Sequence, residues 1–299
     1  MIPELCPPVD ILQPKTDPVP LVISSPHSGQ IYPPSLLESV ALGPAHLRRL
    51  EDGCVDQLFD GGPNLGAPLL RARFARAYVD TNREAFELDP DLFEVPLPAH
   101  VNVASVKARA GLGTIPSRLG GRPVYRSKLS FAEAERRIHL AYWPYHEALQ
   151  RLLKQAMAAF RGVLLLDCHS MPSVTANGAI SADGAIDIAL GDRFGRSCAA
   201  AVVARAETVL RRQGLRVARN RPYAGGYITA RYGRPDDGVH ALQIEVRRDL
   251  YMDERSLRPH ATFVALKAVI QELLVDLAAF MLAYVAEQRP LLAHYPSAS

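Results

Sequence analysis

The sequence contains one uninterrupted apolar segment with the length of a buried β-strand. Gly162-Val163-Leu164-Leu165-Leu166 is followed at once by the polar residues Asp167-Cys168-His169-Ser170. A strand without alternating polar residues has to be covered on both faces, which is typical of a mostly parallel sheet between helices. This segment therefore predicts an α/β fold and places polar side chains where the strand ends.

Other apolar strands alternate with helical patterns along the chain. We expect strands at 21–24, 69–80, 215–218 and 240–246, and helices at 44–58, 130–160, 194–213 and 257–287. Ser130 and Glu133 form a capping box, and Pro144 should kink that helix or begin a second segment. Residues 86–129 should form irregular loops with a short hairpin. The alternation predicts a single three-layer α/β/α domain over residues 1–299, with a mostly parallel or mixed central sheet and a Pro-rich lead-in at 1–20.

The charge balance excludes a dedicated nucleic-acid or membrane-surface binder. The chain has 34 basic and 31 acidic residues, a formal charge of +3, whereas such binders need a strong basic excess. Of the basic residues, 29 are Arg. Coding bias explains most of this skew, but arginine forks also suit an anionic substrate.

The sequence predicts a soluble, cytoplasmic protein. Its four cysteines form no CxxC pair, and its N-terminus lacks the basic start and apolar run of a signal peptide. The apolar stretch 262–285 contains Lys267, Glu272 and Asp276. These charges predict a packed helix and not a membrane span.

Three chemically active side chains lie at the ends of predicted strands, namely His27, His169 and Glu245. In open α/β sheets, binding sites form beyond the carboxyl ends of the strands. A hydrolytic zinc site needs three ligands of the His or carboxylate type and one open position. The two histidines are candidate ligands. Asp52 and Asp56, four residues apart on a predicted helix, are both candidates for the third ligand.

Two further features suggest catalytic or binding roles. Glu245 interrupts an apolar strand, and a buried carboxylate there needs a partner or a function. It could be the general base beside a metal, or it could pair with Arg247. Asn82-Arg83 could hold a substrate carboxylate, or Arg83 could form an ordinary salt bridge with Asp80 or Glu84.

Other catalytic classes have less support in the sequence. It contains no GxSxG element, no P-loop and no GxGxxG. Cys168 cannot form a dyad with its neighbour His169, although a distant histidine such as His27 could activate it. A cysteine hydrolase therefore stays an alternative, as does a metal- or ligand-binding protein without turnover.

Eight segments occur in a characteristic order along the chain. They are SPHSG (25–29), VDTNR (79–83), ARAGLGTIPSRLGGRPVY (108–125), PYH (144–146), LLLDCHSMPS (164–173), GDRFG (191–195), PYAGGYITARYGRP (222–235) and HALQIEVRRDLYMDE (240–254). Through these segments the chain resembles the N-formylglutamate amidohydrolase (N-formylglutamate deformylase) family over about residues 20–255.

The resemblance implies a fold related to that of zinc carboxypeptidases and one Zn²⁺ per chain. By position, the implied metal ligands are His27, Asp52 and His169, and the implied general base is Glu245. The substrate-binding residues that it implies are Asn82, Arg83, Arg193, Tyr227 and Arg247.

The implied reaction converts N-formyl-L-glutamate, a small anionic N-acyl amino acid, to formate and glutamate at the last step of histidine breakdown. Another N-acyl amino acid or a small peptide is the alternative substrate.

Overall fold

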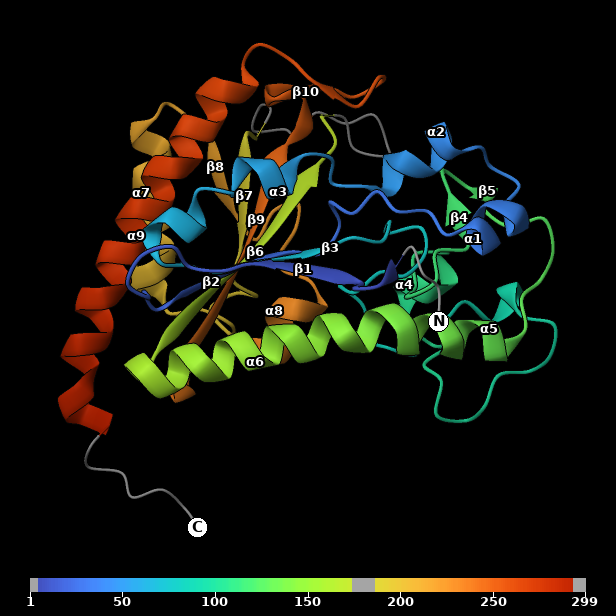
Figure 1. Cartoon of the computed structure of the whole chain (residues 1–299), viewed down its shortest axis with the longest axis horizontal. Coiled ribbons are helices and arrows are strands. Elements are labelled where there is room, and N and C mark those ends of the chain that lie inside the picture. The colour runs from blue at the N-terminus through green and yellow to red at the C-terminus, as the bar shows by residue number, and fades with distance from the viewer. Residues whose placement is uncertain (1–4, 174–185, 293–299) are drawn as a thin grey trace.

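A mixed seven-stranded sheet forms the centre of the molecule (Figure 1). The structure is a computed structural model that describes residues 5–173 and 186–292. In spatial order the strands are β1 (Val9–Leu12), β3 (Leu69–Ala72), β2 (Leu21–Ser25), β6 (Val163–Met171), β9 (Val239–Arg247), β7 (Ile188–Gly191) and β8 (Val217–Arg219). The four neighbours β3, β2, β6 and β9 are parallel, whereas β1 and β7 run antiparallel to their inner neighbours. The predicted α/β class with a mixed sheet is confirmed.

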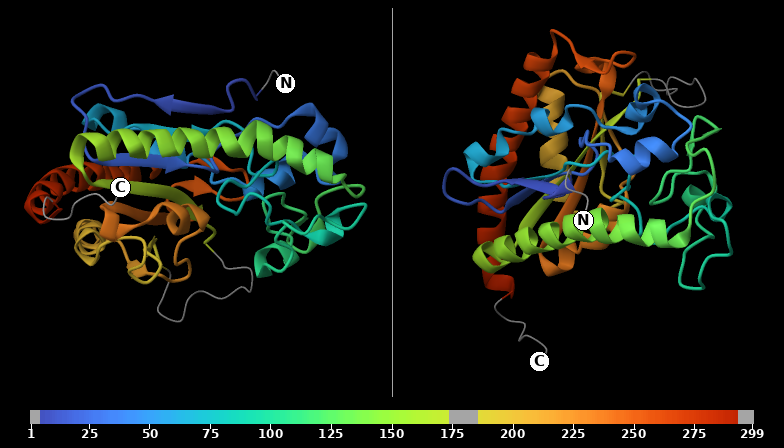
Figure 2. Two further views of the ribbon diagram at one scale, coloured as in Figure 1. Left: turned by 90° about the horizontal axis from the view of Figure 1, so that it is seen from below. Right: turned by 45° about the vertical axis from the view of Figure 1, so that its right-hand side comes forward.

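Helices cover both faces of this sheet, so the central strands are buried throughout. Val163 and Leu165 of β6 point into one apolar core, and Leu164 and Leu166 point into the other. The first core lies against α6 (Trp143–Phe160), and the second against α3 (Val55–Leu58), α7 (Ala200–Arg212) and α9 (Phe263–Leu292). Figure 2 shows the long helices α6 and α9 from two further sides, running in clearly different directions. Two covered faces explain why the strand at 162–166 shows no polar alternation.

Shorter elements surround the sheet. The remaining helices and strands are α1 (Pro34–Ser39), α2 (Pro44–Leu47), η2 (Arg48–Leu50), η3 (Gly62–Leu65), η4 (Pro90–Leu92), α4 (Val106–Arg109), β4 (Arg118–Leu119), β5 (Arg122–Pro123), α5 (Phe131–Arg137), the π-helical segment η5 (Ile138–Tyr142), α8 (Tyr227–Tyr232), η6 (Pro235–Asp237), η7 (Arg248–Leu250), β10 (Met252–Asp253) and β11 (Arg258–Pro259). The β4–β5 hairpin lies within the loop-rich region 86–129, as predicted.

The helical segment between 130 and 160 follows its sequence signals closely. The Ser130 side chain accepts a hydrogen bond from the Glu133 amide and caps α5. Pro144 has no N–H to donate to a carbonyl in the preceding turn. The chain makes a π-helical turn at 138–142, in which the Trp143 amide donates to the Ile138 carbonyl, before α6 begins. Pro144 therefore starts a second segment of the same helix.

The structure departs from the sequence expectations at three places. The Pro-rich lead-in expected at 1–20 contains the edge strand β1 at residues 9–12; residues 1–4 lie outside the described part. The helix expected at 44–58 is broken, since Glu51 is extended and Cys54 has a positive φ of 60°. The short strand β7 was not predicted at all.

Helix α9 is long and apolar enough to cross a membrane by length and composition alone. Its most apolar window has a mean hydropathy of 1.8, and 39% of that window is buried within the molecule. Ile270, Leu273 and Leu274 are fully buried in the second core. The charged residues Lys267 and Asp276 pair with Asp60 and Arg205 on other elements. These contacts agree with the predicted packed helix.

Truncating the buried side of α9 should destabilise the fold, whereas truncating its exposed side should not. Leu274→Ala should lower the free energy of unfolding by about 2–5 kcal/mol, because it removes buried methyl groups and leaves a cavity. The matched control is Val275→Ala at a side chain that is 48% exposed, where a change within about 0.5 kcal/mol is expected. Urea denaturation measures both. Equal losses in the two variants would contradict the observed packing of the helix.

Candidate metal centre and active site

Two histidines and one aspartate meet at the carboxyl edge of the parallel strands. His27 follows β2, His169 lies near the end of β6, and Asp52 lies in the turn before α3. Asp52 Oδ2 is 3.2 Å from His27 Nδ1 and 2.9 Å from His169 Nδ1. All three side chains are buried, and their three potential ligand atoms lie within 4.8 Å of one another. The structure thus brings together the three predicted ligands.

The far side of each imidazole is held by another carboxylate. His27 Nε2 is 2.8 Å from Asp80 Oδ1, and His169 Nε2 is 3.1 Å from Asp167 Oδ2. Each imidazole therefore has a carboxylate at both ring nitrogens. With a cation bound beside Asp52, the ring protons would lie on Nε2 and the Nδ1 lone pairs would face the ion. Such outer carboxylates commonly orient the histidine ligands of metals, and a divalent cation fits this donor set.

Asp52 is fixed by contacts to its second oxygen. Oδ1 accepts from Arg248 Nη2 at 3.0 Å and from the Ser170 hydroxyl at 3.2 Å. Burial disfavours the charged carboxylate, but hydrogen bonds from His169 and His27 outweigh it and hold the pKa of Asp52 well below its usual range. Asp52 therefore stays ionised, with Oδ2 directed at the two histidines.

Asp80 is held in the same way from outside the centre. Its Oδ2 accepts from Arg76 at 2.9 Å, and its Oδ1 accepts from the Asn82 amide at 2.8 Å. Burial opposes ionisation here too, but the positive charge of Arg76, together with the contact from His27, keeps the pKa of Asp80 well below its usual range. The imidazole of His27 thus has a charged, rigid support.

Glu245 stands beside the centre with one oxygen available. It is paired with His169 in the parallel register of β6 and β9. Oε1 accepts from Gln243 Nε2 at 2.8 Å, whereas no hydrogen bond to Oε2 occurs among the described residues. Burial, together with the charge of Asp52, raises the pKa of Glu245 to about 7 although His169 and Arg76 oppose this. A carboxylate with such a pKa is suited to proton transfer near neutral pH.

The centre opens into a cavity of about 500 Å³. Besides His27, Asp52, His169 and Glu245, the described residues that line it are Arg49, Leu50, Arg76, Asn82, Arg83, Lys107, Leu112, Ser170, Pro172, Pro222, Tyr223, Ala224, Gly225, Gly226, Gln243 and Arg248. Three of the cations, Arg49, Arg83 and Lys107, form no ion pair with another described residue. The cavity therefore offers positive charge to an anionic ligand.

Asn82 and Arg83, the pair that the sequence suggested for a substrate carboxylate, both line this cavity. Asn82 Oδ1 accepts from the Ile228 amide at 2.8 Å, and its Nδ2 lies 3.1 Å from His169 Nε2. Arg83 donates through Nε and Nη1 to the Leu112 and Asn82 carbonyls. A Cβ at Gly226 would lie 2.4 Å from Asn82 Nδ2, so only glycine leaves Asn82 this position.

The other three predicted substrate contacts lie outside the described cavity lining. Arg247 forms ion pairs with Asp187 at 2.9 Å and with Asp249 at 2.5 Å. Tyr227 packs its ring against His146, with centroids 5.9 Å apart. Arg193 borders Gly225, but its own side chain does not line the cavity. These positions do not support direct substrate contacts in this conformation.

The structure does not support two alternatives that the sequence left open, Asp56 as the third metal ligand and Cys168 as a nucleophile. Asp56 lies on α3 and pairs with Arg71 at 3.0 Å, away from the two histidines. Cys168 is fully buried in the second apolar core on the opposite face of β6 from His169. Burial raises the pKa of its thiol well above the usual range, which does not suit a nucleophile.

Several residues of the site were not recognised as functional from the sequence. Asp80, Arg76, Gln243 and Arg248 all touch or support the centre, as described above. A signal was present for Gln243. It precedes Glu245 by two residues, as Asp167 precedes His169, so each pair shares a face of its strand. Arg76 and Arg248 lie in irregular segments, where no periodicity reveals direction.

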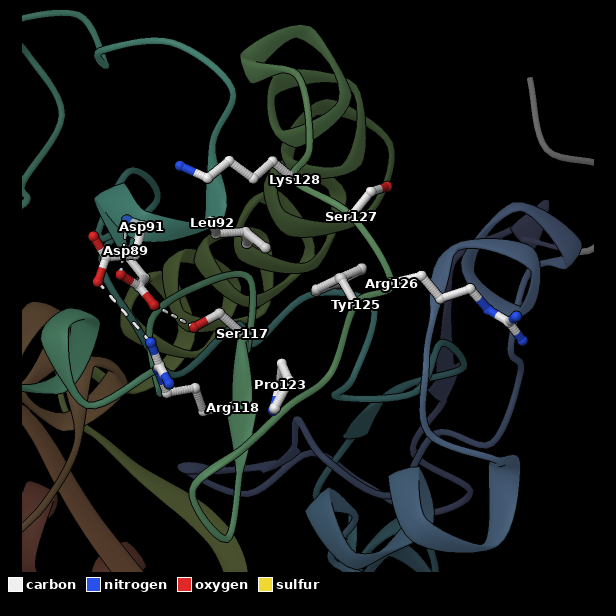
Figure 3. Close-up of a pocket in the computed structure, with 10 residues that line it drawn as sticks. All are labelled: Asp89, Asp91, Leu92, Ser117, Arg118, Pro123, Tyr125, Arg126, Ser127 and Lys128. Atoms are coloured by element: carbon white, nitrogen blue, oxygen red, sulfur yellow. Dashed lines mark hydrogen bonds and ion pairs between the residues drawn. The ribbon is translucent and has the colours of Figure 1, made fainter.

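A second cavity of different character lies between η4 and the β4–β5 hairpin (Figure 3). Its volume is about 320 Å³. Asp89 accepts from the Ser117 hydroxyl at 2.5 Å, and Arg118 approaches Asp91 at 4.0 Å. The described lining includes Arg126 and Lys128 but no histidine. This cavity lacks the donor set of the metal centre.

Comparisons with known proteins place the chain in a family. A family model described as N-formylglutamate amidohydrolase matches residues 19–252. N-formylglutamate deformylase of Pseudomonas aeruginosa is 33% identical over 278 residues, covering 91% of this chain and 97% of the relative. The deformylase of Pseudomonas putida is 30% identical over 269 residues, covering 86% and 92%.

Two solved structures share the fold. The crystal structure of N-formylglutamate amidohydrolase from Ralstonia eutropha JMP134 matches with a TM-score of 0.88 and 37% identity, covering 92% of this chain and 98% of that one. A gene product of Agrobacterium tumefaciens matches with a TM-score of 0.60 and 20% identity, covering 93% and 96%, which supports the fold alone. The sequence matches and the first structure together show that the chain belongs to the N-formylglutamate amidohydrolase family.

Proposed function

We propose that this chain is a metal-dependent hydrolase that converts N-formyl-L-glutamate to formate and glutamate. The observation that carries the proposal is the meeting of His27 Nδ1, Asp52 Oδ2 and His169 Nδ1 beside Glu245, inside a cavity whose lining includes three cations without an ion-pair partner among the described residues. The choice of substrate is supported by the family to which the chain belongs, and the reaction type is supported by the residues of the site. We further propose a cytoplasmic enzyme at the last step of histidine degradation.

The metal ligands in this proposal are His27, Asp52 and His169, and the metal is Zn²⁺. Two imidazoles and one carboxylate form a known catalytic zinc set that leaves a position open. Bound there, the ion would polarise the formyl oxygen and lower the pKa of a water molecule towards neutrality. With the ion bound, the carboxylates of Asp80 and Asp167 would accept the Nε2 protons and favour the tautomer that presents Nδ1 to the ion.

Glu245 acts as the proton carrier in this mechanism. Its Oε2 takes a proton from the attacking water and later delivers it to the amide nitrogen, so the C–N bond breaks to release formate and a free amine. Gln243 holds Oε1 at 2.8 Å and thereby fixes the direction of Oε2. The same residue is base in the first half of the reaction and acid in the second.

The cations of the cavity orient the substrate. N-formylglutamate carries two carboxylates, and guanidinium groups bind carboxylates through paired hydrogen bonds. We assign one carboxylate to Arg83, aided by the side-chain Nδ2 of Asn82, and leave Arg49 and Lys107 for the other. This orientation holds the formyl carbon near Glu245 and supplies catalysis by positioning.

Removing the metal should abolish formate release. Dialysis against a chelator should reduce turnover of N-formyl-L-glutamate by at least about 100-fold, since metal catalysis supplies several kcal/mol of transition-state stabilisation. Adding Zn²⁺ back should restore it. Formate is measured with a coupled dehydrogenase. N-acetyl-L-glutamate and N-formyl-L-leucine serve as comparison substrates. Turnover that persists without metal, or a preference for either comparison substrate, would contradict the proposal.

Replacing the proton carrier should separate chemistry from metal binding. Glu245→Gln should lower kcat by about 10²–10⁴-fold, the usual contribution of a general base, while the bound metal per chain stays unchanged. Metal content is measured by elemental analysis of the same preparation used for kinetics. A variant that keeps its kcat would remove Glu245 from the mechanism.

The two candidate aspartates should differ sharply in metal affinity. Asp52→Asn should weaken Zn²⁺ binding by more than about 100-fold, because even partners outside the ligand shell contribute about 10–100-fold. Asp56→Asn removes only the ion pair with Arg71 and serves as the matched control with unchanged affinity. Competition with a chromogenic chelator measures both constants. Similar affinities in the two variants would refute the assignment of Asp52.

A further inference from the structure

Two buried side chains hold the Asn82–Arg83 loop from the side opposite the cavity. Tyr142 Oη donates to the Arg83 carbonyl at 2.8 Å, and His146 Nε2 contacts the Thr81 carbonyl at 2.9 Å. Both side chains are buried, and neither lines the cavity. The two bonds bracket Asn82, because they fix the carbonyl groups on either side of it.

The hydrogen-bond roles of His146 follow from its partners. A carbonyl can only accept, so Nε2 carries the proton and donates to Thr81. Nδ1 then accepts from the Tyr232 hydroxyl at 2.7 Å. Burial lowers the pKa of His146 to about 4, so the ring is neutral near pH 7. Only one tautomer of the neutral ring makes both bonds.

The π-helical turn before Pro144 places Tyr142 and His146 on the same side of the helix. Tyr142 ends this turn and His146 lies four residues later on α6, so both project towards the same loop. Their ring centroids are 4.3 Å apart. Turns of this kind are frequent at functional sites. Here, an aromatic hydroxyl and an imidazole from consecutive helical turns contact two carbonyl groups of the same loop.

The held loop connects with the metal centre and with the cavity. At one end, Asp80 supports His27 and accepts from the Asn82 amide. In the middle, the Asn82 side chain reaches Ile228 and lies beside His169. At the other end, Arg83 lines the cavity. A shift of the Thr81 or Arg83 carbonyl would therefore move the groups proposed to hold the substrate.

We infer that Tyr142 and His146 are positioning residues that set the orientation of Asn82 and Arg83 for binding the substrate carboxylate. The inference rests on the proposed function, which assigns that carboxylate to Arg83. Loss of either bond should mainly weaken substrate binding, since no bond of Tyr142 or His146 reaches the reacting atoms.

Two replacements of His146 test the bond to Thr81 directly. The amide nitrogen of Gln can occupy the place of Nε2, whereas the amide oxygen of Asn can occupy the place of Nδ1. His146→Gln should retain the bond to Thr81 and lose the bond to Tyr232, and His146→Asn should do the reverse. We expect KM for N-formyl-L-glutamate to rise about tenfold in His146→Asn and to stay within about threefold in His146→Gln, as misplaced binding groups cause losses of this order.

Removal of a single hydroxyl tests the bond to Arg83. Tyr142→Phe should raise KM about fivefold, corresponding to one hydrogen bond of about 1 kcal/mol, and change kcat less. The matched control is Tyr78→Phe, because the Tyr78 hydroxyl is buried in the same apolar core without a hydrogen-bond partner among the described residues. This control should leave both kinetic constants unchanged.

Steady-state kinetics, urea denaturation and calorimetric binding of N-formyl-L-glutamate are measured on the zinc-loaded proteins. Equal KM values for His146→Asn and His146→Gln, or an unchanged KM in Tyr142→Phe, would overturn the inference. Parallel losses of stability and kcat without a change in KM would also overturn it. If the wild type binds this ligand without hydrolysing it, the proposed function fails. The inference is then tested by the dissociation constants, which should rise in His146→Asn and Tyr142→Phe and stay close to the wild-type value in His146→Gln. A wild type that does not bind the ligand would refute both.

Discussion

The site depends on three electron-rich atoms that face one another in a buried space. His27 Nδ1, His169 Nδ1 and Asp52 Oδ2 converge, while Nε2 of each imidazole faces a second carboxylate. Burying so many carboxylates without positive charge beside them would be costly. A divalent cation between the three converging atoms would supply that charge and would use all three as ligands. The supporting contacts of Asp80, Asp167 and Arg248 keep these atoms in place before any ion binds.

The parallel centre of the sheet explains how distant parts of the chain reach this arrangement. Strands β2, β3, β6 and β9 all end at one edge, and residues two apart on a strand share a face. His169 is therefore opposite Glu245 in the register, and Asp167 is opposite Gln243. Apolar residues of both faces are buried beneath helices, and the polar groups of the site gather in the carboxyl-terminal halves of β6 and β9 and in the segments after β2 and β3. Alternation along β6 places Asp167 behind His169, whereas Asp80 reaches His27 from an irregular segment.

The sequence predicted the parts of the site that lie on regular strands and failed where the backbone turns irregularly. His27, His169 and Glu245 could be identified because apolar strands lead directly to them. The choice between Asp52 and Asp56 could not be made from the residues, because a continuous helix was assumed where Glu51 is extended and Cys54 has a positive φ. Arg247 was singled out, yet its neighbour Arg248 reaches Asp52, since β9 ends at 247 and a 3₁₀ turn redirects the chain. Two short strands were missed, β1 at the edge of the sheet and β7 between β9 and β8.

Anomalous X-ray scattering from crystals of the purified protein tests the central claim most directly. Data collected on both sides of the zinc absorption edge should show one strong peak per chain. That peak should lie within bonding distance of His27 Nδ1, His169 Nδ1 and an Asp52 carboxylate oxygen, about 2.0–2.2 Å for zinc. The absence of a peak in zinc-loaded crystals, or a peak bound by other residues, would contradict the account.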